Sequence, residues 1–324
     1  MNSVLAFAGR HGRLLLFFGV LIGFVFPALA AATKPWIGSS VFVFTLGAFL
    51  KVDGNAFRAG LRRPLRAAAV LGWTLVGVPT LAWVLVQLLA VPADIGLAIV
   101  LCMLAPPVGS AAAMAAMLGL NAALALAAAI VISLFAPLYL PPLAALLGGS
   151  TVHIDAVTML GRIVAVIGAA VGAAVLLRRF AGAFVARNPS AKTGVSVVGL
   201  LTVAIGALHG MPHHVSGHGV QALQPIVLAF AVNIGFQLAG FALFWRLGVA
   251  EALTVGLVSG NRNVTLVWVV VAPWLGGLPS VEVYLAASVF SIFMLPLLTK
   301  LLIARWPVPP APEVTSLQGR VPAP

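Results

Sequence analysis

Long runs of apolar residues with almost no charge recur along the whole chain, and they restrict the kind of structure that it can form. Hydrophobic residues make up 62% of the 324 positions and charged residues only 7%, with a mean hydropathy of +1.16. About 20 consecutive apolar residues cross a bilayer as an α-helix, which satisfies its own backbone groups. The sequence therefore predicts an all-α polytopic membrane protein.

Ten such runs can be delimited, five in each half of the chain, and short connections join them. They cover about 14–32, 36–51, 66–90, 95–118 and 121–147, then 157–177, 193–211, 220–247, 252–273 and 281–304. We expect a single transmembrane domain over 1–304 and a disordered, proline-rich tail over 305–324. Because each half has an odd number of spans, the repeats at about 14–147 and 157–304 have opposite orientations, which makes them inverted repeats.

The first run also resembles a cleaved signal peptide. Arg10 and Arg13 precede it, and an Ala-x-Ala sequence follows at residues 28–30. The run is long enough to span a bilayer, and the ten spans form two equal halves only if it is kept. We therefore interpret it as a retained first helix.

Basic residues lie mostly on one side of the predicted membrane domain. If both termini are cytoplasmic, all of the 18 lysines and arginines fall on the inner side except Lys34, Arg162 and Arg262. This bias predicts a protein of the cell inner membrane with both termini in the cytoplasm. It also explains the net charge of +12 without a nucleic-acid partner.

The fourth run of each half is interrupted near its midpoint. Pro106 and Pro107 interrupt the first, and a polar stretch that begins at Gly260 interrupts the second. Prolines remove backbone donors and open a helix. Paired broken helices at matching positions of inverted halves indicate a transporter's binding site, so we expect two discontinuous helices that cross. Ordinary proline kinks are the alternative, and they account for either break alone better than for the pair.

A charged residue, Arg262, lies in the middle of the second interrupted run. A charge at mid-membrane costs about 2.5–3.5 kcal/mol on insertion scales and persists where it faces a protein interior or a water-filled cavity. We interpret Arg262 as facing a solute; a structural arginine bonded to carbonyls of a neighbouring helix is the alternative. The candidate substrate-binding residues are small or polar and lie near the breaks or on the eighth span: Arg262, Asn261, Asn263, Ser259, Thr265, Gly109, Ser110, Asn233 and Gln237.

Two of these residues have a second interpretation. Asn233 and Gln237 share a helix face, and hydrogen bonding between helices is favoured slightly over substrate contact for them.

Other chemistries have no sequence signature. No HExxH, GxSxG or pair of mid-membrane aspartates occurs, so we do not expect an enzyme. We expect no cofactor or metal: Cys102 is interpreted as a packing residue, and the histidine-rich segment 209–218 as an exposed loop. Since no carboxylate lies at mid-depth, an acidic proton relay is not expected.

The chain resembles the bile acid:sodium symporter family, most specifically over residues 92–143. There PADIGLAIVLCMLAPPVGSAAA is similar to the family pattern PAEIAxGxxLxxxCPGGTASN, which in the family is followed by a helix led by Gly-Asn. The positions that match without a gap are Asp94, Pro106, Asn121, Pro137 and Pro141. The resemblance implies ten helices in a panel domain and a core domain, with two discontinuous helices crossing near the midplane.

This chain departs from the family at the sodium ligands. By position, polar family residues fall on about Thr74 and on Ala111, Ala112, Ala125 and Ala129. In the ninth span the family pattern EVGMQN corresponds to VSGNRN, so Val258 and Arg262 replace its glutamate and glutamine, and Asn263 is kept. Alanine supplies no oxygen ligand. Arginine also repels a cation, by roughly 4 kcal/mol at about 4 Å and an effective dielectric of 20.

We therefore expect a secondary transporter that moves a small organic anion or zwitterion by alternating access without sodium coupling. Arg262 would be a tethered substitute for the missing ion, and its guanidinium fork suits a carboxylate. Two alternatives stay open. One is a sodium symporter whose site is rebuilt from Asn261, Asn263, Ser259 and backbone carbonyls. The other is a non-transporting membrane sensor of the same fold.

Overall fold

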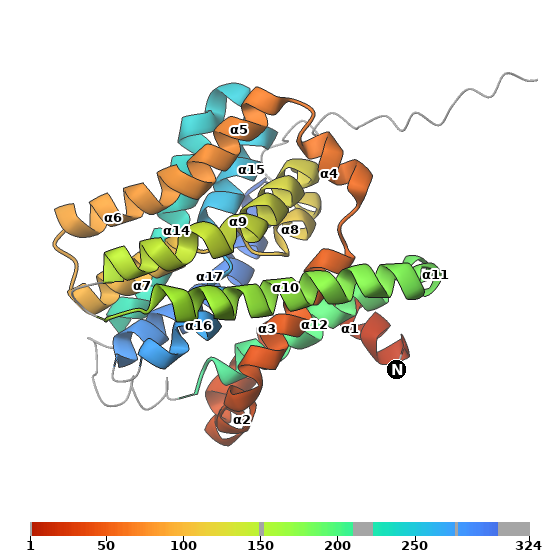
Figure 1. Cartoon of the computed structure of the whole chain (residues 1–324), viewed down its shortest axis with the longest axis horizontal. Coiled ribbons are helices and arrows are strands. Elements are labelled where there is room, and N and C mark those ends of the chain that lie inside the picture. The colour runs from red at the N-terminus through yellow and green to blue at the C-terminus, as the bar shows by residue number, and fades with distance from the viewer. Residues whose placement is uncertain (1, 149–151, 210–222, 276–277, 304–324) are drawn as a thin grey trace, which may run out of the picture.

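The computed structural model describes residues 2–148, 152–209, 223–275 and 278–303, and every regular element in these ranges is a helix (Figure 1). Most of the histidine-rich segment, from residue 210, and the tail from residue 305 lie outside the described residues. Within them, six helices are long and apolar enough to cross a membrane. The prediction of an all-α membrane protein is confirmed. The six are Pro27–Leu50, Pro64–Leu88, Ala122–Leu147, Ala156–Phe180, Leu223–Leu247 and Pro279–Lys300.

One group of helices, here called the α12 bundle, surrounds α12, which packs against both α1 and α3. Small residues allow the close approach: Gly194 lies against the carbonyl of Leu5, and Gly199 lies against the backbone of Ser40 and Phe44. The bundle consists of α1 (Asn2–Val25), α2 (Pro27–Thr33), the short η1 (Lys34–Trp36), α3 (Ile37–Leu50), α10 (Ala156–Phe180), α11 (Gly182–Arg187) and α12 (Pro189–Gly206).

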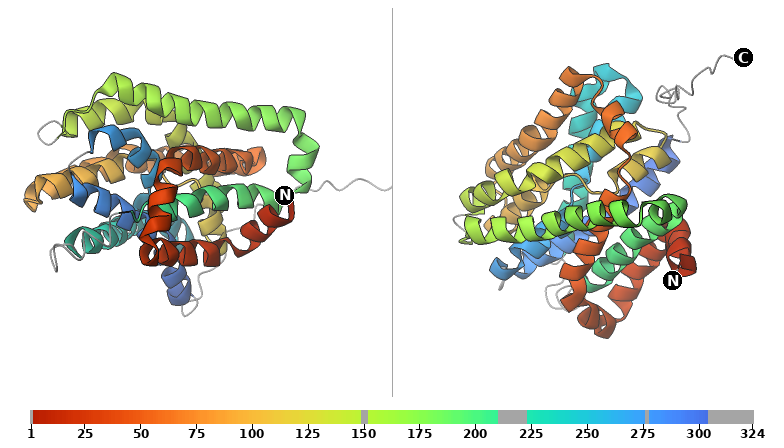
Figure 2. Two further views of the ribbon diagram at one scale, coloured as in Figure 1. Left: turned by 90° about the horizontal axis from the view of Figure 1, so that it is seen from below. Right: turned by 45° about the vertical axis from the view of Figure 1, so that its right-hand side comes forward.

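The remaining helices form a second group, the α7 bundle, in which α7 and α17 are central. Residues 95–104 of α7 are all buried. Its members are α4 (Gly54–Gly60), α5 (Pro64–Gly72), the π-helical η2 (Trp73–Gly77), α6 (Val78–Leu88), α7 (Ala93–Leu104), α8 (Ala111–Met117), α9 (Ala122–Gly148), α14 (Leu223–Phe244), η4 (Trp245–Leu247), α15 (Val249–Gly260), α16 (Val264–Val271), η5 (Ala272–Trp274) and α17 (Pro279–Ile303). Helix α10 of the α12 bundle packs against α3 and also against α9 of the α7 bundle. It runs along the outer side of the molecule (Figure 2).

The first helix differs most from the expected boundaries. A continuous span over 14–32 was expected, but α1 begins at Asn2 and ends at Val25, and α2 begins at Pro27. The residue before a proline is disfavoured in the helical conformation, and Phe26 accordingly adopts φ −116° and ψ 80°. The apolar run continues through this break, so hydropathy alone did not reveal it.

Glycines also bring α14 against α15, and this contact positions the centre of the molecule. A Cβ atom at Gly256 would lie 2.5 Å from the carbonyl oxygen of Gln237, and one at Gly240 would lie 3.0 Å from the Cα atom of Gly256. The two backbones therefore nearly touch. As a result, the polar residues of α14 lie beside the end of α15.

We predict that Gly199→Ala destabilises the protein by about 1–3 kcal/mol, because the added methyl group overpacks a tight helix contact. A Cβ atom there would lie 2.6 Å from the carbonyl oxygen of Ser40. Gly172→Ala on α10 is the matched control, since nothing lies within 4 Å of its Cβ position. Thermal unfolding of detergent-purified variants measures the effect, and equal stability of the two variants would contradict the prediction.

Candidate functional site

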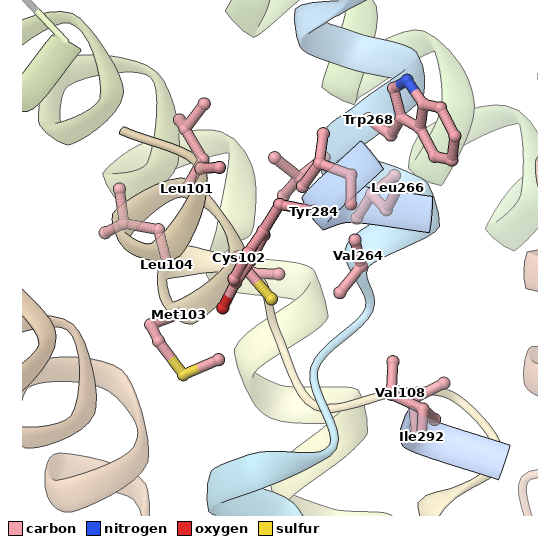
Figure 3. Packing of buried hydrophobic residues seen from close by; sticks show 14 of the residues in the cluster. Leu101, Cys102, Met103, Leu104, Val108, Val264, Leu266, Trp268, Tyr284 and Ile292 are labelled. Carbon is pink, nitrogen blue, oxygen red and sulfur yellow. The ribbon is translucent and has the colours of Figure 1, made fainter. Parts of the chain in front are cut away.

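The two broken helices lie side by side at the centre of the α7 bundle (Figure 3). The N–H group of Val108 donates to the carbonyl of Asn261 at 2.9 Å, and that of Asn263 donates to the carbonyl of Pro106 at 2.6 Å. Pro107 and Arg262 form an isolated antiparallel bridge between them. Each break thus satisfies backbone groups that the other break exposes, as the membrane interior requires.

Arg262 is fully buried at this crossing and donates hydrogen bonds to three backbone carbonyls. Its Nη2 atom lies 3.0 Å from the carbonyl oxygen of Thr74 and 2.9 Å from that of Met103, and its Nη1 atom lies 3.3 Å from that of Val258. The three acceptors belong to η2, α7 and α15. One side chain therefore links three helices of the α7 bundle.

Each of these carbonyls lacks its usual helical donor for a reason that the sequence supplies. The donor for Met103 would be residue 107, which is a proline without an N–H group. The donor for Thr74 is missing because the N–H of Val78 bonds to Trp73 in the π-turn, and residue 79 is again a proline. The third carbonyl, of Val258, is left free because the N–H of Arg262 bonds to Gly260 instead. The guanidinium replaces three absent backbone donors.

Polar residues around the crossing are also bonded to one another. Asn263 caps α16 by accepting from the N–H of Leu266, and it accepts a second bond from Thr265 at 3.0 Å. Ser259 accepts from the indole N–H of Trp73 at 2.9 Å. These contacts fix the side chains on both sides of the second break.

The polar pair on α14 completes this network. Asn233 donates to the side chains of Asn261 at 3.1 Å and Ser291 at 2.9 Å. Gln237 donates to the side-chain oxygen of Asn233 at 2.7 Å. Asn233 thus bonds between helices, which was the slightly favoured interpretation for the pair, whereas Gln237 bonds to Asn233 within α14.

A cavity of about 290 Å³ lies between the α12 bundle and helices α8 and α17. Of the predicted substrate-binding residues, Ser110 alone lines it; Gly109 packs towards Ala48 instead. Leu200 and Phe293 border both this cavity and a space of about 10 Å³ beside Arg262, and so lie between the two. In this conformation Arg262 does not face a solute-sized space, and its contacts match the alternative of an arginine bonded to carbonyls.

The cavity wall includes residues that the sequence did not single out. Lys51, Arg10 and the buried hydroxyl of Ser196 all line it. In the sequence, the two basic residues are indistinguishable from the other cations that flank the spans. Their place in a cavity depends on the packing of helices that are distant in the chain.

Broken helices that cross inside a membrane-spanning helical protein, next to a cavity between two bundles, are features of secondary transporters. A family model described as the Sodium Bile acid symporter family matches residues 40–216, more than half of the chain. The chain belongs to this family, whose members are membrane transporters. The match includes α7 and α8, while Arg262 lies beyond it. In a comparison with curated proteins, no sequence matches.

We predict that Arg262→Met lowers the free energy of unfolding by about 2–4 kcal/mol, because it leaves three buried carbonyls without donors. Arg58→Met is the matched control, since Arg58 is exposed. Thermal unfolding in detergent measures both variants. An Arg262→Met protein as stable as the control would mean that other groups satisfy these carbonyls.

Proposed function

We propose that the protein is a secondary transporter that moves a small organic anion or zwitterion across the inner membrane by alternating access, without sodium coupling. In this proposal ten spans form two inverted repeats, with both termini in the cytoplasm. The observation that carries it is the bonding of the Arg262 guanidinium to the carbonyls of Thr74, Met103 and Val258.

The position of the guanidinium supports its role as a substitute for sodium. Its acceptors lie in the third, fourth and ninth spans, three of those from which the family takes its sodium ligands by the resemblance above. Ala111, Ala125 and Ala129 supply no side-chain oxygen in their place. A guanidinium stays charged and cannot dissociate, so it keeps the region near the N-terminal end of α16 positive in every state of the cycle.

The two ends of the molecule support alternating access. The cavity lies at the end that carries Arg10 and Lys51. Towards the opposite end, Lys34 of η1 lies 3.8 Å from Glu282 of α17, and Arg162 of α10 lies over the ring of Trp274 at 5.9 Å. Both contacts join the α12 bundle to the α7 bundle. They are made by the two cations that the charge distribution assigns to the outer side, so we propose that they close the outer end.

We predict that sodium, potassium and choline chloride at matched ionic strength give the wild type the same unfolding temperature. A bound ion would raise this temperature by mass action, but Arg262 fills the site that the ion would occupy. Arg262→Ala should be less stable and should regain part of its stability when millimolar guanidinium is added. Stabilisation of the wild type by sodium alone would favour a sodium symporter with a rebuilt site.

We predict that Lys34→Gln and Arg162→Gln weaken the outer closure. An exposed ion pair such as Lys34–Glu282 contributes up to about 1 kcal/mol, and an exposed cation–π contact such as Arg162–Trp274 about 0.5–1 kcal/mol, so each substitution should shift the population by no more than about fivefold. The measurement is the labelling of Ser110→Cys in the cavity by a membrane-impermeant maleimide, in inside-out and right-side-out vesicles. Labelling should fall from the inner side and rise from the outer side.

The control for this labelling experiment is Arg58→Gln, which touches neither contact. Native Cys102 is buried and should give a low background. Unchanged labelling from both sides in Lys34→Gln and Arg162→Gln would contradict the assignment of these contacts to the outer closure.

A further inference from the structure

The cavity contains a lysine that no described carboxylate pairs with. Lys51 is the first residue after α3, and its half-buried side chain lines the cavity wall. The carboxylates that form ion pairs in the described residues do so elsewhere: Glu251 pairs with Arg63 and Arg66, and Glu282 pairs with Lys34. Among the described residues, the cavity wall contains no acidic side chain.

This unpaired charge is energetically unfavourable in the empty protein. Burial lowers the pKa of Lys51 from 10.5 to about 8, because the ammonium form loses hydration and gains no counter-ion. A cation held in a cleft in this way marks a candidate binding site for an anion. The cleft provides the geometry that such a site needs.

The lining of the cavity combines a few polar groups with many apolar side chains. The Ser196 hydroxyl is buried, lines the cavity and has no hydrogen-bond partner among the described residues. It lies against Gly47 of α3, which is one helical turn before Lys51 in the chain. Apolar side chains of α8 and α17 also line the cavity: Met114, Met117, Phe290, Phe293 and Met294.

We infer that Lys51, with the Ser196 hydroxyl as a second donor, binds the negatively charged group of the transported solute, and that this solute is an organic monoanion with an apolar body. The inference rests on the proposed transport function. The cavity of about 290 Å³ is just below the range for ligand pockets, about 300–1,000 Å³. The solute is therefore small.

Binding at Lys51 is linked to its protonation. In the empty protein the amine loses its proton as the pH rises through about 8, whereas a bound anion favours the ammonium form and raises the pKa. Above that pH, the neutral amine, one proton from solution and the anion combine to form an ammonium–anion pair. Affinity therefore falls as the pH rises through this range.

Lys51 is well placed to dominate this pH dependence. The charged groups near it are Arg10 of α1, Arg178 of α10, which donates to carbonyls at the end of α3, and Asp53, which caps α4. The arginines stay protonated over this range. The cavity-lining residues of α8, α12 and α17 include no ionisable side chain. Lys192 of α12 lies outside the cavity wall.

The first test compares choline phenylacetate with its uncharged counterpart phenylacetamide as stabilisers of the full chain in phosphatidylcholine nanodiscs. At pH 7 the anion should raise the unfolding temperature of the wild type, and the amide should not. Lys51→Gln should bind the anion about tenfold more weakly, as expected for loss of a charge-assisted hydrogen bond. Lys51→Arg should keep the affinity and lose its pH dependence between pH 7 and 9.5.

The Lys51→Gln variant should still fold, because it removes a half-buried charge without a carboxylate partner, which opposes folding at pH 7. Equal stabilisation of the wild type and Lys51→Gln by phenylacetate overturns the inference, as does the absence of any anion effect on the wild type. Stabilisation of the wild type by sodium, with the Lys51 results intact, would instead refute the sodium-independent function and leave this site in place. Failure of the inference about Lys51 and failure of the proposed sodium-independent function therefore give different results.

The second test measures the protonation of Lys51 directly. The chain has four lysines, at positions 34, 51, 192 and 300, so amine acetylation followed by mass spectrometry can follow each one separately. Labelling of Lys51 should rise with a midpoint near pH 8 and be suppressed by phenylacetate, while Lys34 at the opposite end is unaffected. If phosphatidylglycerol in the nanodisc suppresses the labelling of Lys51 and phenylacetate does not, a lipid headgroup binds at Lys51. That result would overturn the inference.

Discussion

A guanidinium bonded to three backbone carbonyls holds the centre of this protein together. Prolines at positions 79 and 107 and the end of α15 each leave a carbonyl without a donor, and no water in a bilayer interior can replace it. Arg262 has several donors in a rigid fork and stays charged, so it can serve three acceptors at once. The broken helices and the arginine therefore depend on each other: the breaks expose the acceptors, and the acceptors make a buried arginine tolerable.

The sequence predicts the parts of this arrangement that depend on local chemistry. Apolar run lengths predict the helices, and Pro106, Pro107 and Gly260 lie where α7 and α15 give way to extended segments. The partners of Arg262 depend instead on packing between residues up to 188 positions apart. The sequence directed attention to the side chain at Thr74, whereas the guanidinium binds its backbone carbonyl. That acceptor exists only because a π-turn precedes a proline.

The cavity is a second case in which sequence patterns do not predict contacts between distant helices. Lys51 follows an apolar run and looks like any other cation at the inner end of a span. It becomes distinctive only when α1, α3, α8, α12 and α17 pack so that its side chain lies in a cavity whose described lining has no carboxylate. Conversely, Asn233 and Gln237 share a helix face and were also candidates for solute contact, but close glycine packing places them beside the end of α15. Burial, which sequence patterns report poorly, separates these cases.

Two cations of different chemistry therefore occupy different depths in this molecule. A tethered guanidinium at the crossing can neither bind nor leave, so it cannot transfer free energy from an ion gradient to a solute. A lysine whose pKa lies at about 8 can do so if it gains a proton together with the anion. The difference matters energetically, because moving one unpaired negative charge against a membrane potential costs about 2.3 kcal/mol per 100 mV. An anion that enters with a proton carries no net charge and avoids this cost, so under the proposed binding at Lys51 the titratable lysine would supply the coupling that the fixed arginine is proposed to remove.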